Sequence, residues 1–223
     1  AATMIILHRN PKVLIICGTP IVMSLAVTFG LTVMANIELT PMIIAAGPIL
    51  IGLGVDYALH MLNRIEEVRR KEIKKVQDEN IRRKKKGEEL EKVPDLWDME
   101  FYKKCVLEMA NSTGVAVLLS AVTTIIGFSV LIAPQIVTVS PIRSVGVTLV
   151  LGIASTLFLS VILVPTLAWM LRFNKRTNPT MWKNIGKLPV KAFIPIVLIF
   201  GSITFIGIAN LEYMNEPITG SSE

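Results

Sequence analysis

The sequence is poor in the residues that build catalytic and metal sites. It contains two cysteines, Cys17 and Cys105, with no CxxC spacing, and two histidines, His8 and His60. This composition argues against a disulfide framework and against a metal cluster. No Ser/His/Asp set stands out, so we expect neither an enzyme nor a cofactor. The opening residues contain no basic n-region and no cleavage site, and no signal peptide is predicted there.

Charged residues are absent from long stretches of the chain. Hydrophobic residues make up 52% of the 223 positions, and the mean hydropathy is +0.59. The apolar residues come in long blocks, which is not typical of a soluble domain. The net charge is +6, but the basic residues lie between the apolar blocks. We therefore expect the lipid bilayer as a partner, and no nucleic acid.

Four or five blocks are long enough to span a bilayer, for which about 20 apolar residues are needed. The fold class predicted from them is all-α, a polytopic bundle of transmembrane helices. The predicted organisation is the tail of one span plus two spans (1–62), a charged helical segment (63–104), two further spans (105–171), a linker (172–189), a fifth span (190–211) and the start of an extracytoplasmic domain (212–223). The chain begins without Met and ends in GSSE, and we interpret it as a piece of a longer polypeptide.

Basic residues alternate between the connecting segments. Of the 23 Lys and Arg residues, 22 lie in residues 8–12, 64–104 and 172–191, and only Arg143 lies elsewhere. The positive-inside rule therefore places these three segments in the cytoplasm. We expect the protein to be a multi-pass protein of the plasma membrane.

The segment 64–104 carries 14 basic and 11 acidic residues. Pairs such as Glu66/Arg70 and Glu88/Lys92 have i,i+4 spacing, so much of the segment should be helical. A solvated helix or hairpin is the first interpretation. The alternative is a site for anionic lipid headgroups, built on five consecutive basic residues. These residues are Arg82, Arg83, Lys84, Lys85 and Lys86.

One carboxylate lies inside an otherwise uncharged block. Asp56 is the sixteenth residue of block 41–62 and precedes Arg64 by eight residues, which is roughly 12 Å along a helix. An Asp near the bilayer centre costs about 2.5 kcal/mol or more, so a partner, water or a proton has to compensate it. Gly52 and His60 are each four residues from Asp56, and we expect all three on one helix face.

Small and hydroxyl-bearing residues should enclose this carboxylate between helices. Gly52 and Gly54 leave room for a neighbouring helix to approach closely. The block 105–133 offers a polar stripe that could hydrogen-bond the carboxylate or line a thread of water. The residues of this stripe are Ser120, Thr123, Thr124 and Gly127.

Two roles are open for Asp56. It could be a protonated structural group that ties helices together, or it could bind and release protons, and we favour the second role because intramembrane acids are usually functional. Tyr57 could join the same hydrogen-bond network or simply pack. His60 could relay protons one turn nearer the charged flank, or lie at the interface without a role.

The same residues resemble a known family. The stretch GPILIGLGVDYALHMLNRIEE is similar to the fourth transmembrane helix of resistance-nodulation-division (RND) transporters, in the hydrophobe-exporter branch that includes the mycobacterial membrane protein large (MmpL) type. The stretches SAVTTIIGFSVLIAP and GVTLVLGIASTLFLSVILVPTLA resemble the fifth and sixth helices. The resemblance covers most of the chain, from the end of helix two to helix seven, and it also extends to the sterol-sensing unit of Patched-like proteins.

The resemblance implies a half-transporter in which Asp56 is the proton-relay acid and Tyr57 its hydrogen-bonding partner. It implies proton-driven export of a hydrophobic or lipid-like substrate, together with a second half of the same transporter and, as a further option, a homo-oligomer. The segment 64–104 is longer than the family leads us to expect. The alternatives are a SecD/SecF-like protein-export motor and a lipid-sensing module without transport.

Overall fold

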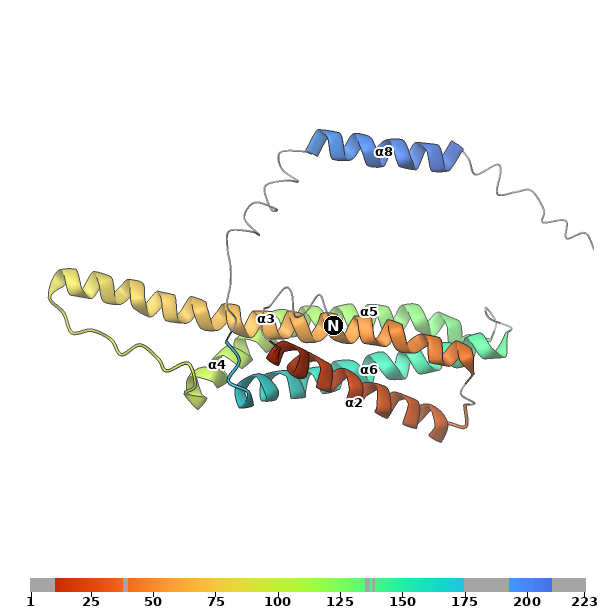
Figure 1. Ribbon diagram of the computed structural model, residues 1–223, viewed down its shortest axis with the longest axis horizontal. Helices are drawn as coiled ribbons and strands as arrows, with labels where there is room; N and C mark the ends of the chain where they lie inside the picture. Colours follow the sequence, from red (N-terminus) through yellow and green to blue (C-terminus); the bar gives the residue numbers. More distant parts are fainter. Residues whose placement is uncertain (1–10, 38–39, 135–136, 138, 175–192, 210–223) are drawn as a thin grey trace, which may run out of the picture. The chain divides into compact units, whose positions relative to one another are not determined.

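The computed structural model describes residues 11–37, 40–134, 137, 139–174 and 193–209. The chain divides into two units, residues 1–176 and 177–223, and each is described by itself. Every regular element assigned in the described residues is helical (Figure 1).

Four helical runs are long and apolar enough to cross a membrane: Lys12–Met34, Pro41–Lys86, Met99–Ile132 and Ser140–Met170. They correspond to the first four blocks predicted from the sequence, and they confirm an all-α, multi-pass bundle. The first, second and fourth runs are the helices α2, α3 and α6. The third run is composite. It joins α4 (Met99–Met109), the π-helical turn η1 (Ala110–Gly114), α5 (Val115–Ser129) and the 3-10 turn η2 (Val130–Ile132).

Helix α3 is longer than its apolar block. It begins after Thr40, whose side chain accepts a hydrogen bond from the backbone N–H of Ile43, and Pro41 occupies the first turn. It continues for 46 residues and ends at Gly87, which has φ +72°. The helical prediction for the charged segment therefore holds as far as Lys86. Residues 87–98 then return to α4 without forming a helix (Figure 1).

Glycines allow α2, α3 and α6 to pack closely. A Cβ atom added at Gly54 of α3 would lie 2.9 Å from Ile21 of α2 and 2.9 Å from Thr156 of α6. One added at Gly152 would lie 2.5 Å from Leu50. Both positions therefore need glycine for steric reasons, as in helix contacts of membrane proteins generally.

Buried hydroxyl groups join α2 to α6. The Thr156 hydroxyl donates to Ser24 Oγ at 3.1 Å, and the Thr32 hydroxyl lies 3.4 Å from Thr148 Oγ1. All four side chains are buried. Ser24 and Thr32 also donate to backbone carbonyls of their own helix. These groups thus have partners where no water reaches them.

A second polar cluster lies where α2 begins and α6 ends, which we call the basic end of the bundle. Arg69 of α3 is 1% exposed and contacts Glu66 Oε1 at 2.5 Å. It also donates to the carbonyl oxygen of Phe173 at 2.8 Å and stacks over the ring of Trp97 at 5.0 Å. The Tyr102 hydroxyl donates to the carbonyl oxygen of Pro165 at 2.8 Å. The cluster therefore fastens α3, α4 and the end of α6 together.

Helix α8 (Phe193–Ala209) belongs to the second unit and has 17 residues. It is apolar, but at about 1.5 Å per residue it is shorter than a bilayer core, and it is not among the four candidate spans. The fifth span thus stays a prediction. The predicted tail 1–10, most of the linker 172–189 and the segment 212–223 lie outside the described residues.

Candidate functional site

Asp56 and His60 form a pair on the outward face of α3. His60 Nε2 lies 3.1 Å from Asp56 Oδ1, and the two side chains are 61% and 63% exposed. We expected neighbouring helices to enclose the carboxylate, and within the described residues they do not. The reason is helical phase. Tyr57, Ala58 and Met61 hold the buried face of α3, and Asp56 and His60 lie beside that face.

The pair lies at the edge of a small cavity of about 160 Å³ between α3 and the composite helix. Room for one water needs only about 10–15 Å³, so the cavity has space for several. Its lining combines hydroxyl groups and the Asp56–His60 pair with apolar side chains. The lining residues are Asp56, Tyr57, His60, Thr113, Ala116, Val117 and Ser120.

Tyr57 lines the same cavity from the buried face of α3. Its side chain is almost fully buried, and among the described residues its hydroxyl has no hydrogen-bond partner. An unsatisfied buried hydroxyl costs about 1–3 kcal/mol. A group that carries such a cost is a candidate for a bond that forms only with water or with a partner surface.

The predicted hydroxyl stripe on α5 reaches the site with one member. Ser120 lines the cavity, whereas the hydroxyls of Thr123 and Thr124 both donate to the backbone carbonyl of Ser120 at 2.8 and 2.7 Å. Gly127 has open space where a side chain would be. Of these four residues, Ser120 is the one that lines the cavity. Thr113, in the π-helical turn, takes the place that the sequence analysis gave to the threonines of α5.

The two glycines near Asp56 have different surroundings. Gly54 lies at the close contact with α2 and α6, on the buried face. Gly52 is exposed, and a Cβ added there would meet nothing within 4 Å. Within this unit, only Gly54 thus serves the close helix approach that was predicted for both.

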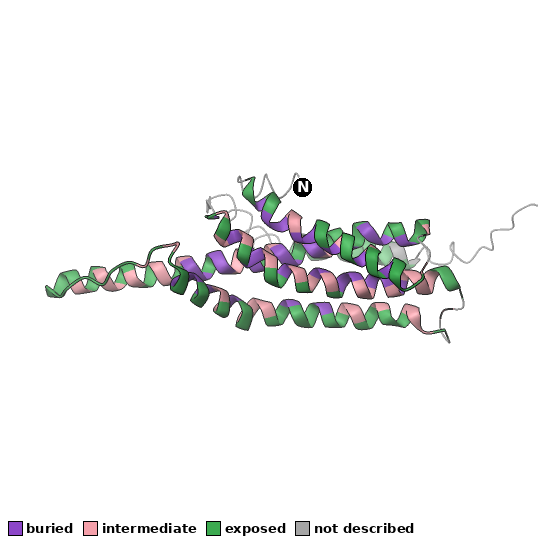
Figure 2. Ribbon diagram, turned by 90° about the horizontal axis from the view of Figure 1, so that it is seen from below, coloured by how far each residue is buried: buried purple, intermediate pink, exposed green. Residues whose placement is uncertain are grey.

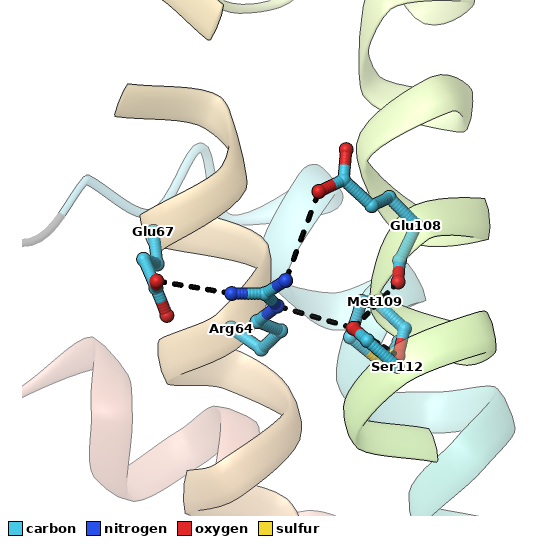
Figure 3. Close-up of polar contacts among 5 residues, drawn as sticks. All are labelled: Arg64, Glu67, Glu108, Met109 and Ser112. Atoms are coloured by element: carbon cyan, nitrogen blue, oxygen red, sulfur yellow. Dashed lines mark hydrogen bonds and ion pairs between the residues drawn. The ribbon is translucent and has the colours of Figure 1, made fainter. Parts of the chain in front are cut away.

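One turn beyond His60, a group that the sequence analysis missed bridges α3 to the composite helix (Figure 3). Arg64 donates through Nε to Ser112 Oγ at 3.1 Å, and its terminal nitrogens contact Glu67 at 2.9 Å and Glu108 at 3.7 Å. Ser112 in turn donates to the backbone carbonyl of Glu108 at 2.7 Å. The polar stretch ANST at the start of a long apolar block is the signal that could have revealed this contact.

The basic residues 82–86 form the last turn of α3, where positive charges stabilise the helix dipole. Arg83 contacts Glu91 at 3.3 Å, and Asn80 exchanges two hydrogen bonds with the backbone of Glu91. This turn lies roughly 30 Å past Leu62 along the helix axis. Residues 70–86 of α3, which we call the extension, are largely exposed (Figure 2). A contact between residues 82–86 and lipid headgroups would require the extension to lie along the membrane surface, and it stays a prediction.

Comparison with family models finds a similarity in the second half of the bundle. Residues 100–196 match the model of the MMPL family. This segment is therefore similar to the MMPL family. The match confirms the resemblance to RND/MmpL transporters over this segment, which contains α5, α6 and all of α4 except its first residue. No curated protein and no solved structure matches the chain at the level of significance required. The match begins after Asp56 and does not include the Asp56–His60 pair.

Proposed function

We propose that the chain is the membrane core of one half of an RND-type exporter in the plasma membrane. The complete protein would move hydrophobic or amphiphilic molecules, lipids among them, outward at the expense of the proton-motive force. Residues 8–12, 64–104 and 172–191 would lie in the cytoplasm. The MMPL match over residues 100–196 supports the exporter over a protein-export motor.

The observation that carries the proposal is the Asp56–His60 pair, 3.1 Å apart beside a cavity in the apolar part of α3. An exposed carboxylate at this depth cannot face hydrocarbon without a large cost. A second helical surface covering Asp56 and His60 would remove that contact, and protonation would remove the charge. The second half of the transporter, which the family resemblance predicts, would provide this covering surface.

Proton uptake gives this arrangement a mechanism. A proton bound by Asp56 neutralises the carboxylate and weakens its attraction to His60 and to any facing cation. Helix α3 then shifts against its neighbours, while the basic-end cluster around Arg69 holds its other end in place. The membrane potential can drive this movement, because each charge that crosses it carries about 2.3 kcal/mol per 100 mV.

The test is infrared titration of the complete protein together with Asp56→Asn. We expect a carboxylic-acid C=O band that is absent from the variant and that changes between mildly acid and mildly alkaline pH. We also expect the variant to lose gradient-driven export while it keeps the wild-type melting temperature. A carboxyl group that stays in one protonation state throughout this pH range, or unchanged export by the variant, would remove Asp56 from the mechanism.

A further inference from the structure

A polar stripe continues from the Asp56 cavity to the basic end of the bundle. On α3 the stripe consists of Asp56, His60 and Arg64, spaced four residues apart, which keeps them on one face. The first two line the cavity, and Arg64 forms the contacts drawn in Figure 3. Such a stripe gives a continuous series of hydrogen-bonding groups along an otherwise apolar helix.

The composite helix provides the opposite wall of this path. Thr113 lines the cavity, and its neighbour Ser112 accepts the hydrogen bond from Arg64 Nε. Both belong to the π-helical turn Ala110–Gly114. Such turns insert one extra residue and occur frequently at functional sites. The turn thus joins the cavity to the Arg64 cluster through two adjacent hydroxyl residues.

The two acids of this cluster are held differently. Glu67 contacts Arg64 at 2.9 Å, within hydrogen-bond distance, whereas Glu108 lies 3.7 Å from it, beyond that distance. Glu67 therefore neutralises the guanidinium, and protonation of Glu108 breaks only a weak contact. Glu108 is 38% exposed and Glu67 64%, so Glu108 is the less exposed of the two acids that contact Arg64.

We propose that Glu108 is the carboxylate that exchanges protons between the Asp56 cavity and the aqueous phase at the basic end. This inference rests on the proposed function, because it gives Asp56 its route to water. It assigns to Glu108 a role that the sequence motif around Asp56 does not contain.

The protons balance in each step. The Asp56 carboxylic acid gives its proton to His60 Nε2, which leaves a carboxylate and an imidazolium. The imidazolium passes a proton through water and the cavity hydroxyls to the Glu108 carboxylate, and the resulting acid releases it to bulk water. Uptake runs in reverse. The titratable and charged groups near Glu108 are Arg64 of α3, which also contacts Glu67, and Lys104 and Cys105 of its own helix.

The experiment is a pH jump on the complete protein, followed by time-resolved infrared spectroscopy of the Asp56 carboxylic-acid band. We expect Glu108→Gln to slow the appearance of this band by about tenfold, a modest share of what positioned proton-transfer groups typically contribute. A small diffusible buffer acid should restore the rate, since it can deliver protons in place of Glu108. Glu108→Asp should keep most of the rate.

Glu67→Gln is the matched control, because it removes the other carboxylate that contacts the Arg64 guanidinium. We expect it to leave the rate within about twofold of wild type, with no response to the buffer. A wild-type rate for Glu108→Gln, a slowing that the buffer does not relieve, or equal slowing in both variants would overturn the proposal. Absence of any titrating Asp56 band would instead overturn the proposed function, so the two failures are distinguishable.

Discussion

Helix α3 carries two acid–base pairs ten residues apart, and their surroundings are opposite. Glu66 and Arg69 are 4% and 1% exposed, and the arginine has further contacts with Phe173 and Trp97. Asp56 and His60 are more than half exposed and lie beside a cavity with room for water. The sealed pair has its partners within the unit, so it suits a fixed joint. The open pair has room for water beside it, and so it suits proton exchange.

Breaking the sealed pair should give the largest effect on stability. Arg69→Met removes the guanidinium that contacts buried Glu66 and the bond to Phe173. We expect a loss of about 3–5 kcal/mol, the usual cost of removing one partner of a buried ion pair. Thermal unfolding of the complete protein in detergent measures it.

The double variant Glu66→Leu with Arg69→Met removes both charges and should recover most of that loss. Asp56→Asn is the matched control at the open pair, and there we expect a change below about 1 kcal/mol. Equal losses at the two pairs would mean that the difference in burial has no energetic consequence.

Tyr57 tests the boundary between the two regions, since it is buried but lines the open cavity. Tyr57→Phe removes a hydroxyl without a partner among the described residues. We therefore expect unchanged stability or a gain of up to about 1 kcal/mol. The same melting measurement checks it. A clear loss of stability would show that the hydroxyl has a partner in the complete protein, and this would place Tyr57 in the network of Asp56.

A third pair, which joins the extension of α3 to α4, should contribute least to stability. Lys104 Nζ lies 2.6 Å from Glu72 Oε2, and this hydrogen bond lowers the pKa of the Glu72 carboxyl. A lowered folded-state pKa stabilises the fold above the unfolded-state pKa, and the contribution is lost as pH falls through the folded-state value.

Lys104→Met should therefore cost less than about 1 kcal/mol at neutral pH. The difference from wild type should vanish in acid, which melting curves over a pH series would show. A difference that persists at low pH would assign the effect to packing of the lysine side chain and not to the ion pair.

The spans were predictable because hydrophobic blocks of this length have few alternatives, and the MMPL segment was predictable from its helix motifs. The polarity of each block did not reveal which face is buried. Ser24, Thr28 and Thr32 have a spacing of four that could have predicted the seam with α6. The exposure of Asp56, by contrast, depends on which neighbours α3 has. Thr123 and Thr124 use their hydroxyls locally, in hydrogen bonds to the backbone carbonyl of Ser120, which the composition of the stripe did not reveal.

The π-helical turn η1 makes the composite helix sensitive to insertions and deletions. Each residue added to or removed from a helix rotates everything beyond it by about 100°. The five residues Ala110–Gly114 set the orientation of α5 relative to α4. Losing one of them would turn Ser120 away from α3 while Tyr102 kept its contact with Pro165. Substitutions in this stretch are therefore easier to accommodate than any change in the number of its residues.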